Sequence, residues 1–304
     1  MSVSIGSAKR DHTVEVELLG ERFRIRREGT NGDMEKAAAL FTELDGKVAA
    51  FGMGGIDLSL RAAGGTYRFR SAKMLVKGVR STPVLDGTGL KGAVEGSTVA
   101  FLQRECGLDF GGKKVLLTSA VDRWGLAEAL HDAGCEMVFG DLIYALDLPI
   151  PIRKWTTLKV LIRTIAPIVV ALPYKWLYPT GSDQEKAPER KPKVEALYTW
   201  ADIVAGDWQY VRKYMPEDMR GKWVITNTTT AEDLELMRSR GVDLLVTSTP
   251  RLEGRSFGTN VIEATMVALA SASSELPQAE YQRLLDQVGF TPDVRWLQRE
   301  SRAV

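Results

Sequence analysis

The fold is decided by the stretch Lys114-Val-Leu-Leu-Thr-Ser-Ala-Val-Asp-Arg-Trp-Gly-Leu-Ala-Glu-Ala-Leu130, which continues to Glu136-Met-Val-Phe-Gly-Asp141. Its apolar start predicts a strand over 114–119, and the helical spacing that follows predicts a helix over 124–133 that stops at Gly134. A second apolar run predicts a strand over 136–139. Strand, helix and strand in this order are typical of a parallel βαβ unit.

The same rhythm returns further along the chain. Strands are predicted over 203–205, 223–226 and 244–247, with a helix over 231–240 that a capping box of Thr229 and Glu232 begins. Alternating strands and helices with short glycine stops predict an α/β fold, a Rossmann-like doubly wound parallel sheet. We expect this second domain to span 113–304, with a proline-rich and aromatic insertion at about 147–193. Two C-terminal helices, over 259–271 and 279–288, are expected to pack back toward the first domain.

Residues 1–112 are predicted to form a separate α/β domain that binds the substrate. Strands alternate there with a helix over 34–44, and a hairpin turns at Gly20-Glu21 within 14–26. A short strand is expected over 47–51, and glycines at 111 and 112 mark the boundary. At 304 residues the chain has the length of about two domains.

Composition excludes several classes of protein. The chain is 44% hydrophobic and 26% charged, which suits a globular protein and excludes a disordered one. Forty basic against 39 acidic residues give a net charge of +1, which disfavours a nucleic-acid partner. Cys106 and Cys135 form no CxxC pair, and two isolated histidines build no metal site unaided. We see no signal core or spanning stretch and expect a cytoplasmic protein.

A cofactor site is expected at the loop after the strand over 114–119. Asp141, at the end of the next strand, suits hydrogen bonds to a ribose diol and favours NAD over NADP. With Gly125 as the third glycine of the fingerprint, Asp122 takes the second position, where backbone must approach a pyrophosphate. Arg123 offsets that charge, and Ser119 completes the loop. A doubly wound fold without a dinucleotide fits these residues equally well.

Two further loops follow parallel strands and are expected to line the same crevice. Asn227 and Thr228 are placed there as cofactor-binding residues, although capping and turn chemistry explains such residues as well. Arg251 and Arg255 lie in a Gly/Ser-rich stretch and suit a substrate carboxylate or phosphate, because the guanidinium group binds such anions with two hydrogen bonds. A solvated loop is the alternative.

The candidates for catalysis lie in the first domain, in two glycine-rich turns after apolar strands. Lys91, beside Asp86 or Asp57, is a candidate acid–base pair that exchanges a proton with a hydroxyl carbon. An ordinary salt bridge is the more frequent explanation of such a pair. His12 and Asp57 are the candidates for substrate binding.

Residues 155–178 are apolar and aromatic, with basic residues beside Trp155 and Trp176. This pattern is typical of an element that lies on a membrane surface. It equally suits a hydrophobic lid or the contact of a homodimer, and exposed apolar patches more often meet protein.

Eight motifs are spread over most of the chain: GTNGD (29–33), LDGKVAAFGMGGIDL (44–58), TPVLDGTGLK (82–91), VLLTSAVDRWGLAEAL (115–130), FGDLIYALDLPIPI (139–152), WLYPTG (176–181), YMPED (214–218) and TSTPRLEGRSFGTNVIEA (247–264). Through these motifs the chain resembles a bacterial family labelled quinate 5-dehydrogenase, similar to shikimate/quinate dehydrogenases. The resemblance implies a substrate domain before a Rossmann domain, and NAD-linked (or NADP-linked) oxidation of a ring hydroxyl on a small hydroxylated acid. The alternative is a Rossmann-like binding protein or transferase that handles a lipid or isoprenoid ligand at a membrane surface.

Overall fold

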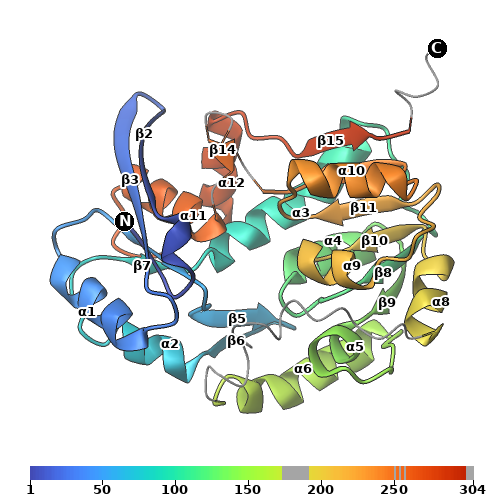
Figure 1. Ribbon diagram of the computed structural model, residues 1–304, viewed down its shortest axis with the longest axis horizontal. Helices are drawn as coiled ribbons and strands as arrows, with labels where there is room; N and C mark the ends of the chain where they lie inside the picture. The colour runs from blue at the N-terminus through green and yellow to red at the C-terminus, as the bar shows by residue number, and fades with distance from the viewer. Residues whose placement is uncertain (173–191, 250, 253–254, 257, 299–304) are drawn as a thin grey trace. The chain divides into compact units, whose positions relative to one another are not determined.

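The computed structural model describes residues 1–172, 192–249, 251–252, 255–256 and 258–298 (Figure 1). The chain forms two compact α/β units, each built on a sheet with mainly parallel strands. Two α/β domains were predicted from the sequence, with a parallel sheet expected in the second. Unit 1 comprises Met1–Ala93, Arg163–Gln184 and Pro250–Phe290, and unit 2 comprises Val94–Ile162, Glu185–Thr249 and Thr291–Val304.

This division differs from the expected boundary at residue 112. The C-terminal helices α11 (Thr259–Leu269) and α12 (Gln278–Gln287), expected within the domain over 113–304, belong to unit 1. Their packing explains the difference, because α11 is buried along most of its length and contacts strands of the unit 1 sheet. The expectation that these helices return to the first part of the chain is thereby met.

Unit 1 has a five-stranded sheet of order β2-β3-β1-β4-β7, in which only β2 runs antiparallel to its neighbour. The predicted hairpin is present and turns at Leu19 and Gly20, both with positive φ. The elements are β1 (Ser2–Ser4), η1 (Ala8–Arg10), β2 (His12–Leu18), β3 (Glu21–Gly29), α1 (Met34–Leu44), β4 (Phe51–Gly54), β5 (Ser59–Ala62), β6 (Gly65–Arg68), α2 (Arg70–Leu75), β7 (Val84–Leu85), the start of α3 (Thr88–Arg104), β13 (Arg251–Leu252), β14 (Arg255–Ser256), α11 and α12.

Strand β4 begins where the predicted strand over 47–51 ends. Its glycines allow the start of α11 to lie directly on the sheet, because a Cβ on Gly52 would meet the carbonyl oxygen of Asn260 at 2.8 Å. No side chain fits at that distance. Gly52 and Gly54 lie within β4 itself, so the glycine run begins in the strand and not in a turn after it. Beside it, Phe41 of α1 packs edge-to-face on Phe51, with ring centroids 5.1 Å apart.

Unit 2 has a six-stranded sheet of order β15-β12-β11-β10-β8-β9. Strands β8 to β12 are parallel, and β15 adds an antiparallel edge that the sequence did not predict. The chain leaves β8 toward β9 on one side and later places β10 on the other, so the topological switch point lies between β8 and β10. The strands are β8 (Lys114–Leu117), β9 (Glu136–Phe139), β10 (Ile203–Ala205), β11 (Trp223–Thr226), β12 (Leu244–Thr247) and β15 (Asp293–Trp296).

Helices cover both faces of this sheet, which makes it doubly wound (Figure 1). One face packs on side chains from α5, α8, α9 and α10. On the other, Trp155 of α6 stacks on Trp124 of α4 at 4.8 Å and lies 5.7 Å from Phe139. The helices, besides the end of α3, are α4 (Trp124–Asp132), α5 (Asp141–Leu146), α6 (Trp155–Val169), α8 (Pro192–Trp200), α9 (Trp208–Tyr214) and α10 (Ala231–Ser239).

The aromatic segment over 155–178 forms helix α6 in its first part, and its residues 173–178 lie outside the described chain. Helix α6 belongs partly to unit 1 and partly to unit 2. Among the described residues, none of the helices combines the length and the apolarity that a crossing of a bilayer requires.

The capping box of α10 lies one residue later than predicted. The side chain of Thr230 accepts a hydrogen bond from the amide of Asp233 at 3.2 Å, and Asp233 Oδ2 accepts one from the amide of Thr230 at 2.9 Å. The pair of Thr229 and Glu232 has the same spacing. Asp233 prevails because it is buried and also binds Arg212 at 3.0 Å, which Glu232 on the exposed side does not offer.

We therefore predict that Thr230→Ala lowers the free energy of unfolding by about 1 kcal/mol, because the first turn of α10 loses an acceptor. Thr229→Ala is the matched control and changes it by less than about 0.5 kcal/mol, as expected of a surface position without such a role. Urea unfolding of both variants measures the difference. Equal losses in the two variants would contradict the observed cap.

Candidate functional site

Polar side chains gather where the parallel strands of unit 2 end. Thr118 follows β8, Asp141 follows β9, and Asp207 follows β10. Ligands of open α/β sheets bind outside the carboxyl ends of the strands, at the switch point. We call Thr118, Asp122, Arg123, Asp141 and Asp207 the switch-point site.

Arg123 is the centre of this site. It precedes α4, is 5% exposed, and its Nη1 lies 2.7 Å from Oε1 of the buried Glu95 on α3. Its Nη2 lies 3.0 Å from Asp207 Oδ2, and its Nε lies 3.5 Å from Asp122 Oδ2. Burial opposes the charge, yet the three carboxylates together raise the pKa of Arg123 above its usual value. The guanidinium is therefore held permanently charged inside the protein.

Asn227 orients the carboxylate of Asp207. Its Nδ2 donates to Asp207 Oδ2 at 2.9 Å, and its Oδ1 accepts from the amide of Trp208 at 3.1 Å. Asp207 Oδ1 in turn accepts from the amide of Gln209 and caps α9. The sequence predicted Asn227 as a cofactor ligand, and the structure shows it as the residue that orients Asp207. Thr228 donates to Thr249 across the ends of β11 and β12 at 3.1 Å.

Asp141 was expected to accept the hydroxyls of a ribose. In the structure it is the first residue of α5, is 9% exposed, and accepts a hydrogen bond from the amide of Val121 at 2.9 Å. Burial raises its pKa to about 6, although backbone hydrogen bonds from the loop act in the opposite direction. The acid therefore binds the very loop that was expected to bind the pyrophosphate.

These contacts do not fit a dinucleotide in the usual pose. The loop after β8 carries the Asp122 carboxylate, 38% exposed, where the phosphates would lie, and one of its amides is occupied by Asp141. Ser119 lies half-buried in that loop and Gly125 half-buried in the first turn of α4. Arg123, expected to offset the charge of Asp122, is already shared among three carboxylates.

Six buried polar atoms of unit 2 have no hydrogen-bond partner within the described part of the chain: Glu95 Oε2, Thr118 Oγ1, Arg123 Nε, Asp141 Oδ2, Tyr144 Oη and Trp208 Nε1. Three of them, on Thr118, Asp141 and Trp208, lie close to the carboxyl ends of strands. Each belongs to a residue that closely follows a different one of the three neighbouring strands β8, β9 and β10. Buried polar groups are nearly always paired, so a cluster of exceptions indicates a water, an ion or a ligand. Sequence reasoning missed Thr118, which lies inside the predicted strand over 114–119, and Asp207 and Trp208, which follow the predicted strand over 203–205.

In unit 1, the predicted catalytic residues Asp86 and Lys91 have different partners: Asp86 binds backbone amides, and Lys91 lies near Asp57. Asp86 Oδ2 accepts from the amides of Leu58 and Ser59 at 2.5 and 3.2 Å, and its Oδ1 accepts from the amide of Thr88 at 2.9 Å. Asp86 therefore holds the loops after β4 and β7. Lys91 Nζ lies 3.9 Å from Asp57 Oδ1, so Asp57 is the observed carboxylate partner.

A buried glutamate binds the backbone of the loop that contains Asp86. Glu263 of α11, 1% exposed, accepts from the amide of Gly87 at 2.6 Å and from the Tyr281 hydroxyl at 2.7 Å. Burial raises the pKa of Glu263 to about 7. The sequence signal for Glu263 was that it is the one charged residue of α11, and this signal was not used.

The remaining predicted site residues are His12, Arg251 and Arg255. His12 is exposed at the start of β2, opposite Arg27. The backbones of Arg251 and Arg255 belong to the paired strands β13 and β14. Their side chains lie outside the described residues.

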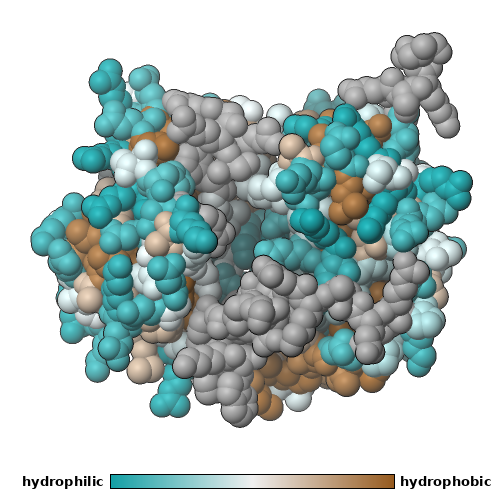
Figure 2. Space-filling model, in the orientation of Figure 1, coloured by the Kyte–Doolittle hydropathy of each residue, from teal (hydrophilic) through white to brown (hydrophobic). Residues whose placement is uncertain are grey.

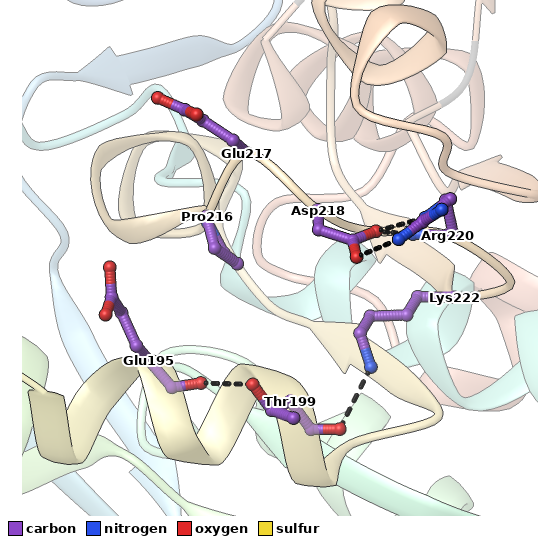
Figure 3. Close-up of a pocket in the computed structure, with 7 residues that line it drawn as sticks. All are labelled: Glu195, Thr199, Pro216, Glu217, Asp218, Arg220 and Lys222. Atoms are coloured by element: carbon purple, nitrogen blue, oxygen red, sulfur yellow. Dashed lines mark hydrogen bonds and ion pairs between the residues drawn. The ribbon is translucent and has the colours of Figure 1, made fainter.

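A surface pocket of about 560 Å³ lies at the opposite edge of the unit 2 sheet (Figure 3). Its residues come from α8 and from the segment before β11, at the amino ends of the strands. Asp218 and Arg220 bind each other there at 2.7 Å, and Lys222 Nζ donates to the carbonyl of Thr199 at the end of α8 (Figure 3). Asp218 and Arg220 thus pair with each other, and Lys222 binds the carboxyl end of a helix. Because these charges already have partners within the protein, we favour the carboxyl edge of the sheet as the functional site.

Residues 89–297 match the family model described as "Domain of unknown function (DUF8754)", and the chain belongs to this family. Residues 1–86 match a second model, "Domain of unknown function (DUF8753)". Among curated proteins no relative was found.

Several solved structures are similar over most of the chain. L-tryptophan dehydrogenase from Nostoc punctiforme has 12% identity and a TM-score of 0.37, with 86% of this chain and 66% of that one covered. Hetero-hexameric glutamate dehydrogenase from Thermus thermophilus has 14% identity and a TM-score of 0.43, with coverage of 87% and 64%. A galactofuranose binding protein has 10% identity and a TM-score of 0.38, with coverage of 91% and 86%. The chain spans less than two thirds of the two dehydrogenases.

The burial of Asp141 predicts a pH dependence of stability. Its pKa in the folded protein, about 6, exceeds the ordinary value of 3.8. Its contribution to stability is therefore fully present below about pH 4 and is lost as the pH rises through about 6. Relative to wild type, Asp141→Asn gains on the order of 2–3 kcal/mol of unfolding free energy over this range. Urea unfolding at pH 4.5, 5.5 and 7 measures it, and parallel curves for the two proteins would contradict the burial of the acid.

Proposed function

We propose that the chain binds a small molecule rich in hydroxyl groups, uncharged or cationic, at the switch-point site. The observation that carries this proposal is the set of partnerless buried atoms on Thr118, Asp141 and Trp208 beside partly exposed carboxylates. A ligand hydroxyl both donates and accepts, so it suits acceptors such as Asp141 Oδ2 and donors such as Trp208 Nε1.

Charge supports the class of ligand. Asp122 and Asp207 are the partly exposed acids of the site, with side chains 38% and 22% exposed, whereas the guanidinium of Arg123 is buried behind them. Carboxylates accept strong hydrogen bonds from hydroxyl and ammonium groups and repel phosphate. Tyr210 of α9 lies near both acids, which add to burial in raising the pKa of its phenol. Its half-buried ring offers a flat face to a sugar or a cation.

The second candidate is the activity that the family resemblance implies, NAD(P)-linked oxidation of a ring hydroxyl on a quinate-like acid. The pair of Lys91 and Asp57 at the carboxyl edge of the unit 1 sheet supports it, since an ammonium beside a carboxylate exchanges a proton with a hydroxyl. The misfit of the loop after β8 opposes a nicotinamide cofactor in the usual pose. Substrate and cofactor identity under this candidate rest on the resemblance alone.

Calorimetry with four probes tests the first proposal: a neutral polyol such as inositol, an amino sugar, quinate and NAD. We expect the polyol and the amino sugar to bind more tightly than quinate. Asp207→Asn should weaken that binding by at least tenfold, because one hydrogen bond to a charged group contributes about 1.5–3 kcal/mol. Asp218→Asn, in the pocket at the opposite edge, is the matched control and should bind as wild type does.

The NAD arm separates the two candidates. We expect wild type to bind NAD more weakly than about 1 mM, because Asp122 opposes the pyrophosphate by charge and bulk. Asp122→Gly removes that obstacle, so it should not weaken NAD binding and should weaken polyol binding. Micromolar binding of NAD to the wild type, with no polyol binding, would overturn the first proposal and favour the dehydrogenase.

A further inference from the structure

Six consecutive residues of unit 2, 145–150, are exposed. They form the end of α5 and the start of the loop that follows it. They include Leu146, Leu148 and Ile150, which are 54%, 45% and 55% exposed. Val160 on α6, the next helix along the chain, is 62% exposed. Of the seven large hydrophobic side chains that are strongly exposed in the described chain, three fall within the five residues 146–150, so the exposure is concentrated there and not scattered.

The backbone of this run is held in place. Asp147 adopts the left-handed conformation, with φ of 57°, and ends α5. Beyond the run, Ile152 exchanges two backbone hydrogen bonds with Phe139 of the edge strand β9, at 2.8 and 3.0 Å. Pro149 and Pro151 restrict the chain between these two points. The apolar side chains are therefore presented outward by an anchored loop.

Basic residues border the apolar side chains. Arg153 and Lys154 are exposed directly after the loop, and Lys159 precedes Val160 on α6. Arg153 lies over the ring of Trp200 at 5.4 Å, and Lys159 lies over the ring of Trp155 at 5.8 Å. Within 145–160, Asp147 is the one acidic residue against three basic ones. We call this stretch the 145–160 surface.

We propose that the 145–160 surface binds the headgroup region of an anionic membrane. Leu146, Leu148 and Ile150 enter the boundary between headgroups and acyl chains, and the basic residues contact lipid phosphates. Figure 2 shows hydrophobic residues gathered along the lower margin of the molecule, where Figure 1 draws α5 and α6. The proposal is independent of the switch-point site, which lies at the carboxyl edge of the sheet.

The positive charge of the 145–160 surface favours an anionic membrane over a second copy of the chain as its partner. A symmetric dimer through this surface brings identical patches together, so Arg153, Lys154 and Lys159 of one copy would face an equally basic surface. An anionic bilayer instead offers negative charge around an apolar interior. Apolar insertion joined to basic contacts is the combination that peripheral membrane proteins use.

Co-sedimentation of the full-length protein with vesicles tests the proposal. We expect binding to vesicles of phosphatidylcholine with about 30% phosphatidylglycerol. The bound fraction should fall at least fivefold on pure phosphatidylcholine or in 0.5 M salt. Leu148→Ser/Ile150→Ser should abolish insertion, and Arg153→Glu/Lys154→Glu should abolish the preference for anionic lipid.

Two matched controls exclude general effects. Leu19→Ser/Met74→Ser removes two exposed hydrophobic side chains of unit 1, and Arg22→Glu/Arg24→Glu reverses two exposed charges on β3. Both should bind vesicles as the wild type does. Equal binding by the loop variants and these controls would overturn the proposal. So would a dimer in light scattering that Leu148→Ser/Ile150→Ser dissociates, because the surface would then contact a second copy.

Discussion

The ion pair between Arg123 and Glu95 is the interaction on which the carboxyl edge of unit 2 depends. Both side chains are almost fully buried, at 6% and 2% exposure, and lie 2.7 Å apart. Removing one partner of such a pair costs about 3–5 kcal/mol, because an uncompensated charge remains inside the protein. Asp207 then shares the guanidinium at 3.0 Å and starts α9, so the pair connects α3, the loop after β8 and the loop after β10.

This arrangement accounts for the loop after β8, which differs from the glycine-rich loop of dinucleotide-binding proteins. In a dinucleotide-binding protein the loop after the first strand presents glycines and free amides to phosphate. Here it presents Asp122, while Asp141 occupies the amide of Val121. The strand order determines where a ligand can bind, and the side chains at that place determine which class of ligand binds there. Under the proposal made above, these side chains offer hydrogen-bond acceptors to ligand hydroxyls and disfavour an anionic ligand.

Regular elements were predicted well from the sequence because local patterns specify them. The strands β9 to β12 and helix α1 have the predicted bounds, since apolar runs and glycine stops mark both ends. The partners of Arg123 were not predicted, because Glu95 and Asp207 are 28 and 84 residues away and only the fold brings them together. Asp86 was predicted as a catalytic residue. The structure shows it accepting three backbone hydrogen bonds, a role that no sequence pattern distinguishes from catalysis.

A double-mutant cycle on Arg123 and Glu95 tests whether their buried ion pair organises the carboxyl edge of unit 2. Arg123→Met alone should lower the free energy of unfolding by about 3–5 kcal/mol, because it leaves the Glu95 carboxylate buried without its partner. Adding Glu95→Met should restore most of that loss, so that the two changes are strongly coupled. Losses that simply add, each below about 1 kcal/mol, would show that the pair does not organise the carboxyl edge and would contradict the account given above.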